Sequence, residues 1–334
     1  MKILDDEKFI KTVEGLIDPA EVCNLFFFQG FKKLLPKTLF KKLLIKTSKK
    51  TPYMGFVIEP YSLFLFFKLT DIEKAKSLLP ERFELVKARV FEDDEPDYYF
   101  GIGNLNTRGS TFWGVRLESY LIAKDKQTGL LSWIFFDILS NTIIALPSEG
   151  VADPNSKDAL FTTSSKGDIY VDIKDDSTDR QLVLNGNINH GKMRKPDHTL
   201  WVNGNTSIGH IKDLSDYGDD PFAVIFDPSE VGQALDLPPE DFRITKNTLV
   251  PDFAEQKLSK VACFPFTQHY IADSPGCRTY IRSTEDLIAN YNKMTQMKEI
   301  KTFSTKTLRR LFFTGILISP LISLLLFVLL MLRL

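Results

Sequence analysis

The residue pattern with the clearest chemical capacity lies in the apolar run 112–123, which carries three polar side chains at a spacing of two. In an extended strand such side chains share a face, so Arg116, Glu118 and Tyr120 are expected to lie together. If that face points inward, a buried Arg–Glu pair can hold a carboxylate or carbonyl head group. If it points outward, the pair is an ordinary exposed salt bridge that contributes little. Periodicity alone favours neither face.

Other residue types that could do chemistry lack the context that their chemistry needs. His190, His198, His210 and His269 have no cysteine or acidic partner at metal-ligand spacing, so we expect no metal site and no cofactor. The three cysteines are widely spaced and make neither a disulfide framework nor a zinc motif. Ser148 does not lie in a nucleophile elbow, which disfavours a hydrolase triad.

The elements that would position these side chains are mainly strands. Runs of strand length are separated by turn signals, among them Asn-Gly at 185–186 and 203–204. Asp71 could cap a short helix that ends at Pro80. The pattern predicts a mainly β protein with flanking helices (α+β), as a closed barrel or a sandwich. The runs cover 61–67, 98–103, 112–123, 131–136, 168–173, 182–188, 200–202, 222–225 and 261–270.

The near-neutral charge of −1 conceals a basic arm on an acidic body. Residues 22–50 contain eight lysines and no acidic residue. Their apolar residues recur at helical spacing, which is typical of a basic amphipathic helix on an anionic membrane surface. Packing of the same apolar stripe on the body is the alternative. We assign 1–50 to this arm and 51–285 to the β domain, and the low net charge excludes a nucleic-acid-wrapping surface.

The C-terminal run 311–332 has 22 residues without a charge, which is long enough to span a bilayer as a helix. Residues 286–310 are expected to form an amphipathic helix and a basic juxtamembrane segment. Lysines and arginines before the span predict a cytosolic body under the positive-inside rule. The acidic start of the chain does not resemble a signal peptide. We therefore predict a single-pass, tail-anchored membrane protein.

The stretch FKLTDIEKAKSLLPERFELVKARVF resembles the entry to the acetoacetate decarboxylase-like family, with Leu79-Pro80-Glu81-Arg82-Phe83 matching its turn. Residues 114–118 are similar to the family's Gly-x-Tyr-x-Glu strand, with Arg116 in place of the tyrosine. Residues 140–149 can be laid on its Gly-Arg-Glu-x-x-Gly-x-Pro-Lys-Lys segment. The resemblance covers roughly residues 54–270. It implies a closed antiparallel β-barrel with flanking helices around an apolar central cavity.

The same resemblance shows where the chemistry departs from the family. The family's lysine pair is replaced by Ser148-Glu149, and decarboxylation there needs a lysine that forms a Schiff base. Serine cannot form an iminium, and Glu149 would raise the pKa of a neighbouring amine. We therefore expect no Schiff-base decarboxylase activity.

Three functions remain open from the sequence. The first is a membrane-anchored barrel that binds a small hydrophobic, acyl or isoprenoid-like ligand at the cytosolic membrane face, through Arg116, Glu118, Tyr120 and Ser148. The second is a lyase or hydrolase on the same fold, with Glu118 and Glu149 as acid or base on a hydrophobic keto or lactone substrate. The third is an interaction scaffold with a filled barrel. The first two imply a lipid bilayer and a small hydrophobic molecule as partners.

Overall fold

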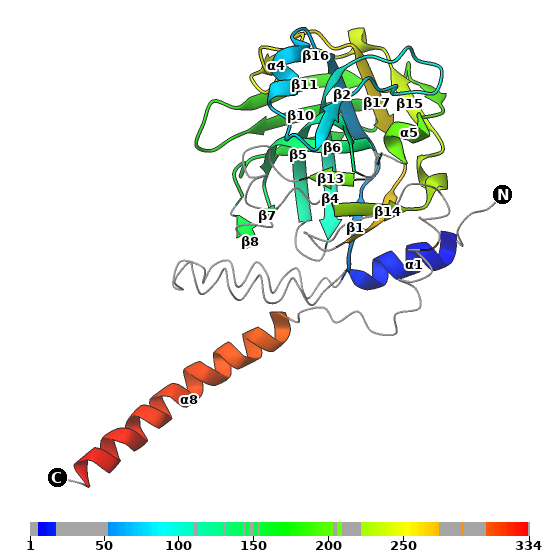
Figure 1. The fold of residues 1–334 in the computed structure, drawn as a ribbon. Coiled ribbons are helices and arrows are strands. Elements are labelled where there is room, and N and C mark those ends of the chain that lie inside the picture. The colour runs from blue at the N-terminus through cyan, green and yellow to red at the C-terminus, as the bar shows by residue number, and fades with distance from the viewer. Residues whose placement is uncertain are drawn as a thin grey trace.

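A computed structural model gives the fold as a β-rich domain with one long helix that projects from it (Figure 1). The predicted basic helices of 22–50 lie outside the described residues, and so does the predicted amphipathic helix near 286–303 except for residue 289. The structure describes residues 6–17, 53–109, 113–127, 129, 131–142, 144–146, 150–152, 154–202, 206–208, 222–273, 289 and 305–332.

Most described strands belong to one 12-stranded sheet, in which all pairs are antiparallel except β13–β6. β4 lies near its middle and pairs with β2, β1 and β5. The order is β12 (Lys192–Arg194), β15 (Ala234–Leu237), β17 (Lys260–Phe264), β2 (Ser62–Lys68), β4 (Tyr99–Gly109), β1 (Tyr53–Ile58), β18 (Gln268–Asp273), β14 (Phe222–Phe226), β13 (Thr206–Ile208), β6 (Leu131–Ser140), β5 (Trp113–Asp125) and β3 (Phe83–Leu85).

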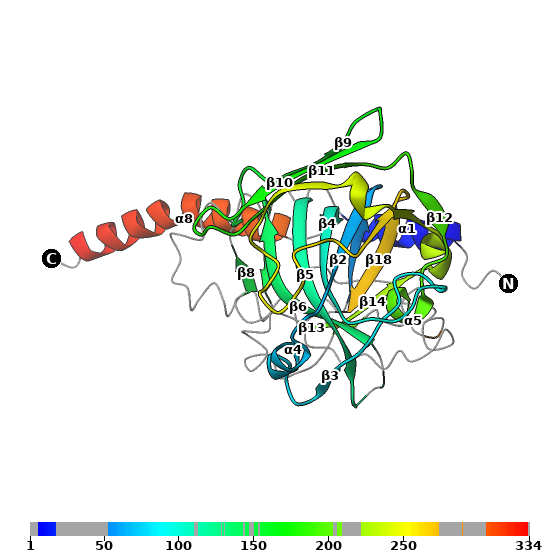
Figure 2. The same cartoon turned by 90° about the horizontal axis from the view of Figure 1, so that it is seen from above.

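Two further sheets accompany the large one. Figure 2 shows strands β9, β10 and β11 of the four-stranded sheet lying across the large sheet. The four-stranded sheet has the order β16 (Arg243–Asn247), β11 (Gln181–Asn187), β10 (Asp168–Lys174) and β9 (Leu160–Thr163). The pair β7 (Ile144–Leu146) and β8 (Gly150–Ala152) forms the third.

The predicted single closed antiparallel barrel is wrong. The described strands form three separate sheets, the order of the large sheet leaves β12 and β3 as edge strands, and β13 runs parallel to β6. The mainly β character holds, but alternating apolar residues report only that a strand has a buried face. They do not report which strands pair, and closure depends on pairing.

Two apolar clusters bury the faces of the large sheet. The first packs its outer side, with Leu117 and Leu121, against the four-stranded sheet, which contributes Phe161 and Val171. The second contains Phe66 of β2, Tyr120 of β5 and Trp133 of β6, together with Phe9 and Val13 of α1 (Asp6–Leu16). Both faces of β5 are therefore buried, which agrees with its nearly continuous burial from Val115 onward.

The short helices are placed by local capping. Asp71 accepts a hydrogen bond from the Lys74 N–H at 3.0 Å and caps α4 (Ile72–Ser77), as predicted. Asp197 caps α5 (His198–Trp201) in the same way through Thr199, so the strand predicted at 200–202 is wrong. The 3₁₀ helices are η3 (Pro228–Val231) and η4 (Pro239–Asp241).

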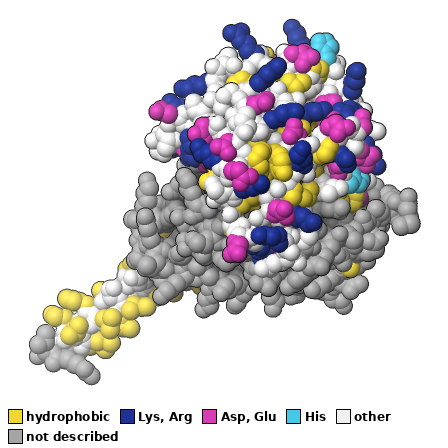
Figure 3. Space-filling model, turned by 45° about the horizontal axis from the view of Figure 1, so that its top comes forward, with side chains coloured by type: hydrophobic (Ala, Val, Ile, Leu, Met, Phe, Trp, Pro, Cys, Tyr) yellow, Lys and Arg dark blue, Asp and Glu magenta, His cyan; other side chains and the backbone are white. Residues whose placement is uncertain are grey.

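The helix α8 (Thr305–Met331) contains the predicted uncharged run except its last residue, Leu332, and begins six residues before that run. Its segment Arg309–Met331 is long and apolar enough to cross a membrane, and none of its most apolar part is buried against the rest of the protein. Figure 3 shows the hydrophobic surface of this helix beside a domain face on which acidic and basic side chains are mixed. A core helix would bury its side chains, and α8 does not.

Two other strand predictions fail for visible reasons. The run 261–270 is two strands, β17 and β18, because the chain turns at residues 265–267. The Asn-Gly pair at 185–186 lies inside β11 and makes no hairpin turn. A side chain at Gly186 would meet the ring of Phe242 at 2.3 Å, so glycine is required here by close packing.

Candidate functional site

Strand β5 places Arg116, Glu118 and Tyr120 on the face that meets the second apolar cluster. The side chains of Arg116 and Glu118 are only 10% and 9% exposed, and Tyr120 is buried. The sequence left open whether the face that carries these three side chains points inward or outward, and the structure shows that it points inward. An exposed ion pair contributes little to the free energy of folding. Burial of this pair costs desolvation free energy, so a role besides stability has to be considered for it.

The three side chains form one hydrogen-bonded chain. Arg116 Nε donates to Glu118 Oε1 at 2.9 Å, and Arg116 Nη2 lies 2.7 Å from the same oxygen. The hydroxyl of Tyr120 donates to the other carboxylate oxygen, Oε2. Burial, and then the negative charge of Glu118, raise the pKa of Tyr120 well above its ordinary value. The phenol therefore keeps its proton and stays a donor to Glu118.

Aromatic rings pack around the Tyr120 end of this polar chain. The ring of Tyr120 lies 5.1 Å from that of Trp133 and 5.0 Å from that of Phe135, measured between centroids. Trp133 continues the contact to Trp201 at 5.3 Å. A buried, apolar environment has a low dielectric constant. It strengthens the attraction between the Arg116 guanidinium and any negative group that reaches it.

A bulge and two glycines shape the same region. The register of β5 against β6 shifts between Ser119 and Tyr120, which places Phe135 opposite Tyr120. On the facing strand β4, Gly101 and Gly103 are the residues opposite Tyr120 and Glu118. A side chain at Gly103 would lie 2.9 Å from the Phe64 ring, so glycine leaves the room that the aromatic rings occupy.

The remaining predicted site residues, Ser148 and Glu149, lie outside the described residues. Their place beside Glu118, and with it the replacement of the family's lysine pair, stays a prediction. Within the described part of the chain, no lysine is among the buried charged side chains, which are Asp94, Arg116, Glu118, Asp125, Asp175, Asp227 and His269. The same residues contain no group of three or more histidine, cysteine and acidic side chains placed to hold a metal ion.

Sequence reasoning missed a second buried polar group, at His269. Its Nδ1 lies 2.8 Å from Glu230 Oε1, its backbone N–H donates to Glu230 Oε2 at 2.7 Å, and its Nε2 lies 3.4 Å from Glu14 of α1. Burial alone would lower the pKa of His269, but the hydrogen bond and charge of Glu230, with Glu14, raise it. Glu14, Glu230 and His269 are far apart in the sequence, so the spacing of residues along the chain could not have indicated that they lie together.

Comparison with known proteins adds one distant likeness. No protein-family model and no curated protein sequence matches the chain. The crystal structure of acetoacetate decarboxylase from Legionella pneumophila subsp. pneumophila str. Philadelphia 1 is similar, at 12% identity and a TM-score of 0.41. The similarity covers 67% of this chain and 85% of that one. It does not assign the chain to that family, and no chemistry follows from it.

Proposed function

We propose that the protein is a membrane-anchored binding protein for a small hydrophobic ligand with a carboxylate or carbonyl head, which Arg116 recognises. The observation that carries this proposal is the buried Arg116–Glu118–Tyr120 chain, with aromatic rings packed around Tyr120. Replacing a buried ion pair with apolar residues is often neutral or stabilising, so stability alone does not explain it. A guanidinium aimed by a neighbouring carboxylate is suited to a planar anionic or carbonyl oxygen group.

The surroundings favour an apolar ligand body over a wholly polar one. Tyr120, Trp133 and Phe135 offer large, rigid, apolar faces, which suit an acyl or isoprenoid-like chain. Helix α8 would hold the domain at a membrane, where such compounds concentrate. The orientation of the domain toward the cytosol is part of this proposal and follows from the basic residues before the span.

A binding titration of the full-length protein in detergent tests the head-group claim. The probes are cis-parinaric acid, a fluorescent fatty acid, and its methyl ester. We expect the acid to bind, and the double variant Arg116→Gln/Glu118→Gln to weaken it at least about tenfold, a loss of ~1.4 kcal/mol. Equal affinity of variant and wild type for the acid would contradict the proposal. The ester reports how much of the affinity depends on the negative charge.

A matched control comes from a second buried ion pair, whose carboxylate also lies on β5. Arg82 Nε and Nη2 donate to the two carboxylate oxygens of Asp125 at 2.8 and 2.7 Å, and both side chains are buried. Asp125 lies at the other end of β5 from Arg116. The variant Arg82→Gln/Asp125→Asn removes the same kinds of group and should leave binding of the acid unchanged.

One observation favours an enzyme as a second candidate. The direct hydrogen bond from Tyr120 to Glu118 places a protonated phenol beside a carboxylate, which are the donor and the acceptor that acid–base chemistry on a carbonyl needs. Turnover of a hydrophobic keto ester or lactone by the wild type, abolished in both Tyr120→Phe and Glu118→Gln, would establish it. Binding without turnover would leave the first candidate.

A further inference from the structure

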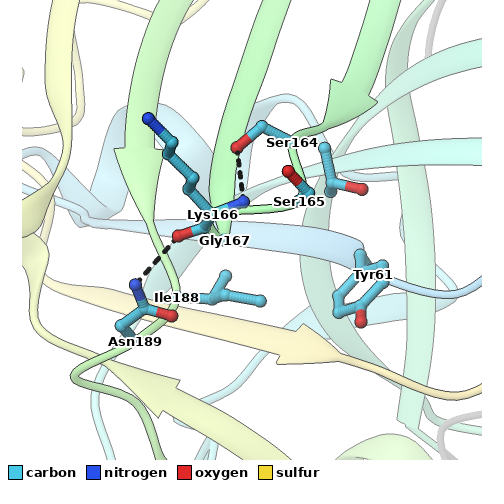
Figure 4. Close-up of a pocket in the computed structure, with 8 residues that line it drawn as sticks. Tyr61, Ser164, Ser165, Lys166, Gly167, Ile188 and Asn189 are labelled. Carbon is cyan, nitrogen blue, oxygen red and sulfur yellow. Dashed lines mark hydrogen bonds between the residues drawn. The ribbon is translucent and has the colours of Figure 1, made fainter.

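A pocket of ≈550 Å³ lies between the turn after β1 and the turn that joins β9 to β10. It is separate from the Arg116 site, because none of its lining residues belongs to that site. The residues that matter for its chemistry are Tyr61, Thr163, Ser165, Lys166, Ile188 and Asn189 (Figure 4).

Tyr61 forms one wall in an unusual backbone conformation. Its φ is 71°, in the left-handed region, and among the described residues it is the one non-glycine residue with a positive φ. Its N–H donates to the Phe264 carbonyl at 2.7 Å, which holds the turn in place. Glycine would adopt this conformation without strain, but it could not supply the aromatic ring. That ring is half-buried against the first apolar cluster, and its remaining surface lines the pocket. The ring faces the side chain of Ile188 in Figure 4.

The opposite turn is rigid before any ligand arrives. Ser164 Oγ accepts hydrogen bonds from the N–H groups of Lys166 and Asp168, both at 3.1 Å, and donates to the Asp168 carboxylate at 2.8 Å. Asn189 Nδ2 donates to the Lys166 carbonyl at 2.9 Å and ties the turn to the chain after β11. A preformed pocket loses little conformational entropy when it binds.

Unused hydroxyl groups complete the lining. Among the described residues, the hydroxyls of Tyr61, Thr163 and Ser165 have no hydrogen-bond partner. Of the lining residues only Lys166 is cationic, and Figure 4 shows its ammonium directed away from Tyr61. Asp168, the nearest carboxylate in the turn, is occupied by Ser164 and by Asn187 at 2.8 Å. The pocket therefore offers an aromatic face, an aliphatic face and neutral hydroxyls.

We infer that this pocket binds a neutral sugar ring. The C–H face of such a ring packs on an aromatic side chain, and its hydroxyls exchange hydrogen bonds with serine and threonine hydroxyls. A phosphate or carboxylate would need a cation aimed into the pocket. The sugar can come from a free saccharide or from a glycolipid head group in the membrane that α8 would enter.

Saturation-transfer NMR on the full chain in lipid nanodiscs tests the inference. The probes are glucose, galactose and mannose in solution, and nanodiscs with and without galactosyl diacylglycerol. We expect saturation to reach the sugar-ring protons of at least one probe. Transfer from free sugars identifies a soluble source, and transfer only in the glycolipid nanodiscs identifies a membrane source. No transfer to any probe overturns the inference.

The variant Tyr61→Gly distinguishes the contribution of the aromatic ring from that of the backbone conformation. Glycine keeps the left-handed conformation, and only the aromatic face is lost. We expect it to fold and to weaken sugar binding about tenfold. The control is Tyr170→Ala, which removes a 43%-exposed tyrosine on β10 outside the pocket and should change nothing. The double variant Thr163→Val/Ser165→Ala keeps the test available if Tyr61→Gly does not fold, and it should also weaken binding. Unchanged binding in either folded pocket variant overturns the inference.

Discussion

At the scale of single residues, the buried ion pair of β5 makes an energetic prediction of its own. Arg116→Met leaves the Glu118 carboxylate buried, and of its partners among the described residues it keeps the Tyr120 hydroxyl. Breaking a buried pair in this way costs ~3–5 kcal/mol, and neutralising both partners costs much less. Urea unfolding should therefore show that Arg116→Met/Glu118→Gln is more stable than Arg116→Met. If the double variant is the less stable of the two, the pair is not the coupled unit described here.

Two glycines of β4 allow a matched test of the aromatic packing. In Gly103→Ala the new methyl group would lie 2.9 Å from Phe64 and 3.5 Å from Tyr120, so the rings must move. Overpacking of this kind costs ~1–3 kcal/mol. In Gly101→Ala the nearest atom, of the Phe66 ring, is at 3.5 Å, which is an ordinary contact. Thermal unfolding should show a clear loss for Gly103→Ala alone, and equal melting temperatures would refute this packing.

The sequence could predict part of this site and not the rest. A spacing of two placed Arg116, Glu118 and Tyr120 on one face, because strand geometry alone determines that. Whether the face was inward depended on Trp133 of the neighbouring strand β6 and on Phe64 of β2. Phe64 meets this face only through the pairing of β2 with β4 and of β4 with β5. The pocket at Tyr61 could not be predicted from the sequence, because the residue type does not indicate that this tyrosine has a left-handed backbone conformation.

At the scale of elements, the docking of α1 should depend on pH. Phe9 and Val13 are fully buried, and Glu14 accepts from Arg108 at 3.1 Å and faces His269 at 3.4 Å. The charged or titratable groups around His269 are Glu230 of η3, Glu14 of α1, Arg108 of β4, Glu59, which pairs with Arg108, and Tyr270. The pKa of His269 is raised in the folded protein.

The sign of the pH effect follows from that raised pKa. The protonated imidazole is stabilised by the two carboxylates, so its contribution is complete below pH ~6.5, the ordinary pKa of histidine. It is lost as the pH rises through the higher folded value. Hydrogen exchange should therefore show better protection of α1 amides at pH 6 than at pH 8, beyond the intrinsic change in exchange rate. His269→Gln should remove the difference, whereas His190→Gln, at an exposed pair with Asp241, should keep it. A difference that persists in His269→Gln would contradict this account.

Helices were predicted correctly where a local feature of the sequence, such as a capping residue or a long uncharged run, determines the structure. The Asp71 cap and the uncharged run of α8 are local, and both were found. The strand expected at 200–202 failed because the Asp197 cap forms a helical turn there, which overrides a short apolar run. The closed barrel failed because sheet order is decided by pairing between segments more than 100 residues apart, such as β2 with β17.

At the scale of the whole molecule, α8 should determine where the protein resides. Large hydrophobic side chains from Leu311 to Leu332, except Phe312, are more than 40% exposed, as expected of a helix surrounded by lipid. In a liposome flotation assay the full chain should float with the lipid, and deletion of 311–332 should leave the domain in the soluble fraction. Flotation of the deletion variant to the same extent would assign membrane binding to another segment.

The central claim is that a hydrophobic ligand lies with its head group at Arg116. The most direct test is photo-crosslinking of the full-length protein with a fatty acid that carries a diazirine next to its carboxyl group, followed by mass spectrometry of the labelled peptides. We expect labelling within Trp113–Asp125 of β5 or its neighbours β4 and β6, competed by unlabelled fatty acid and absent in Arg116→Gln/Glu118→Gln. Labelling confined to α8, or unchanged in that variant, would contradict it.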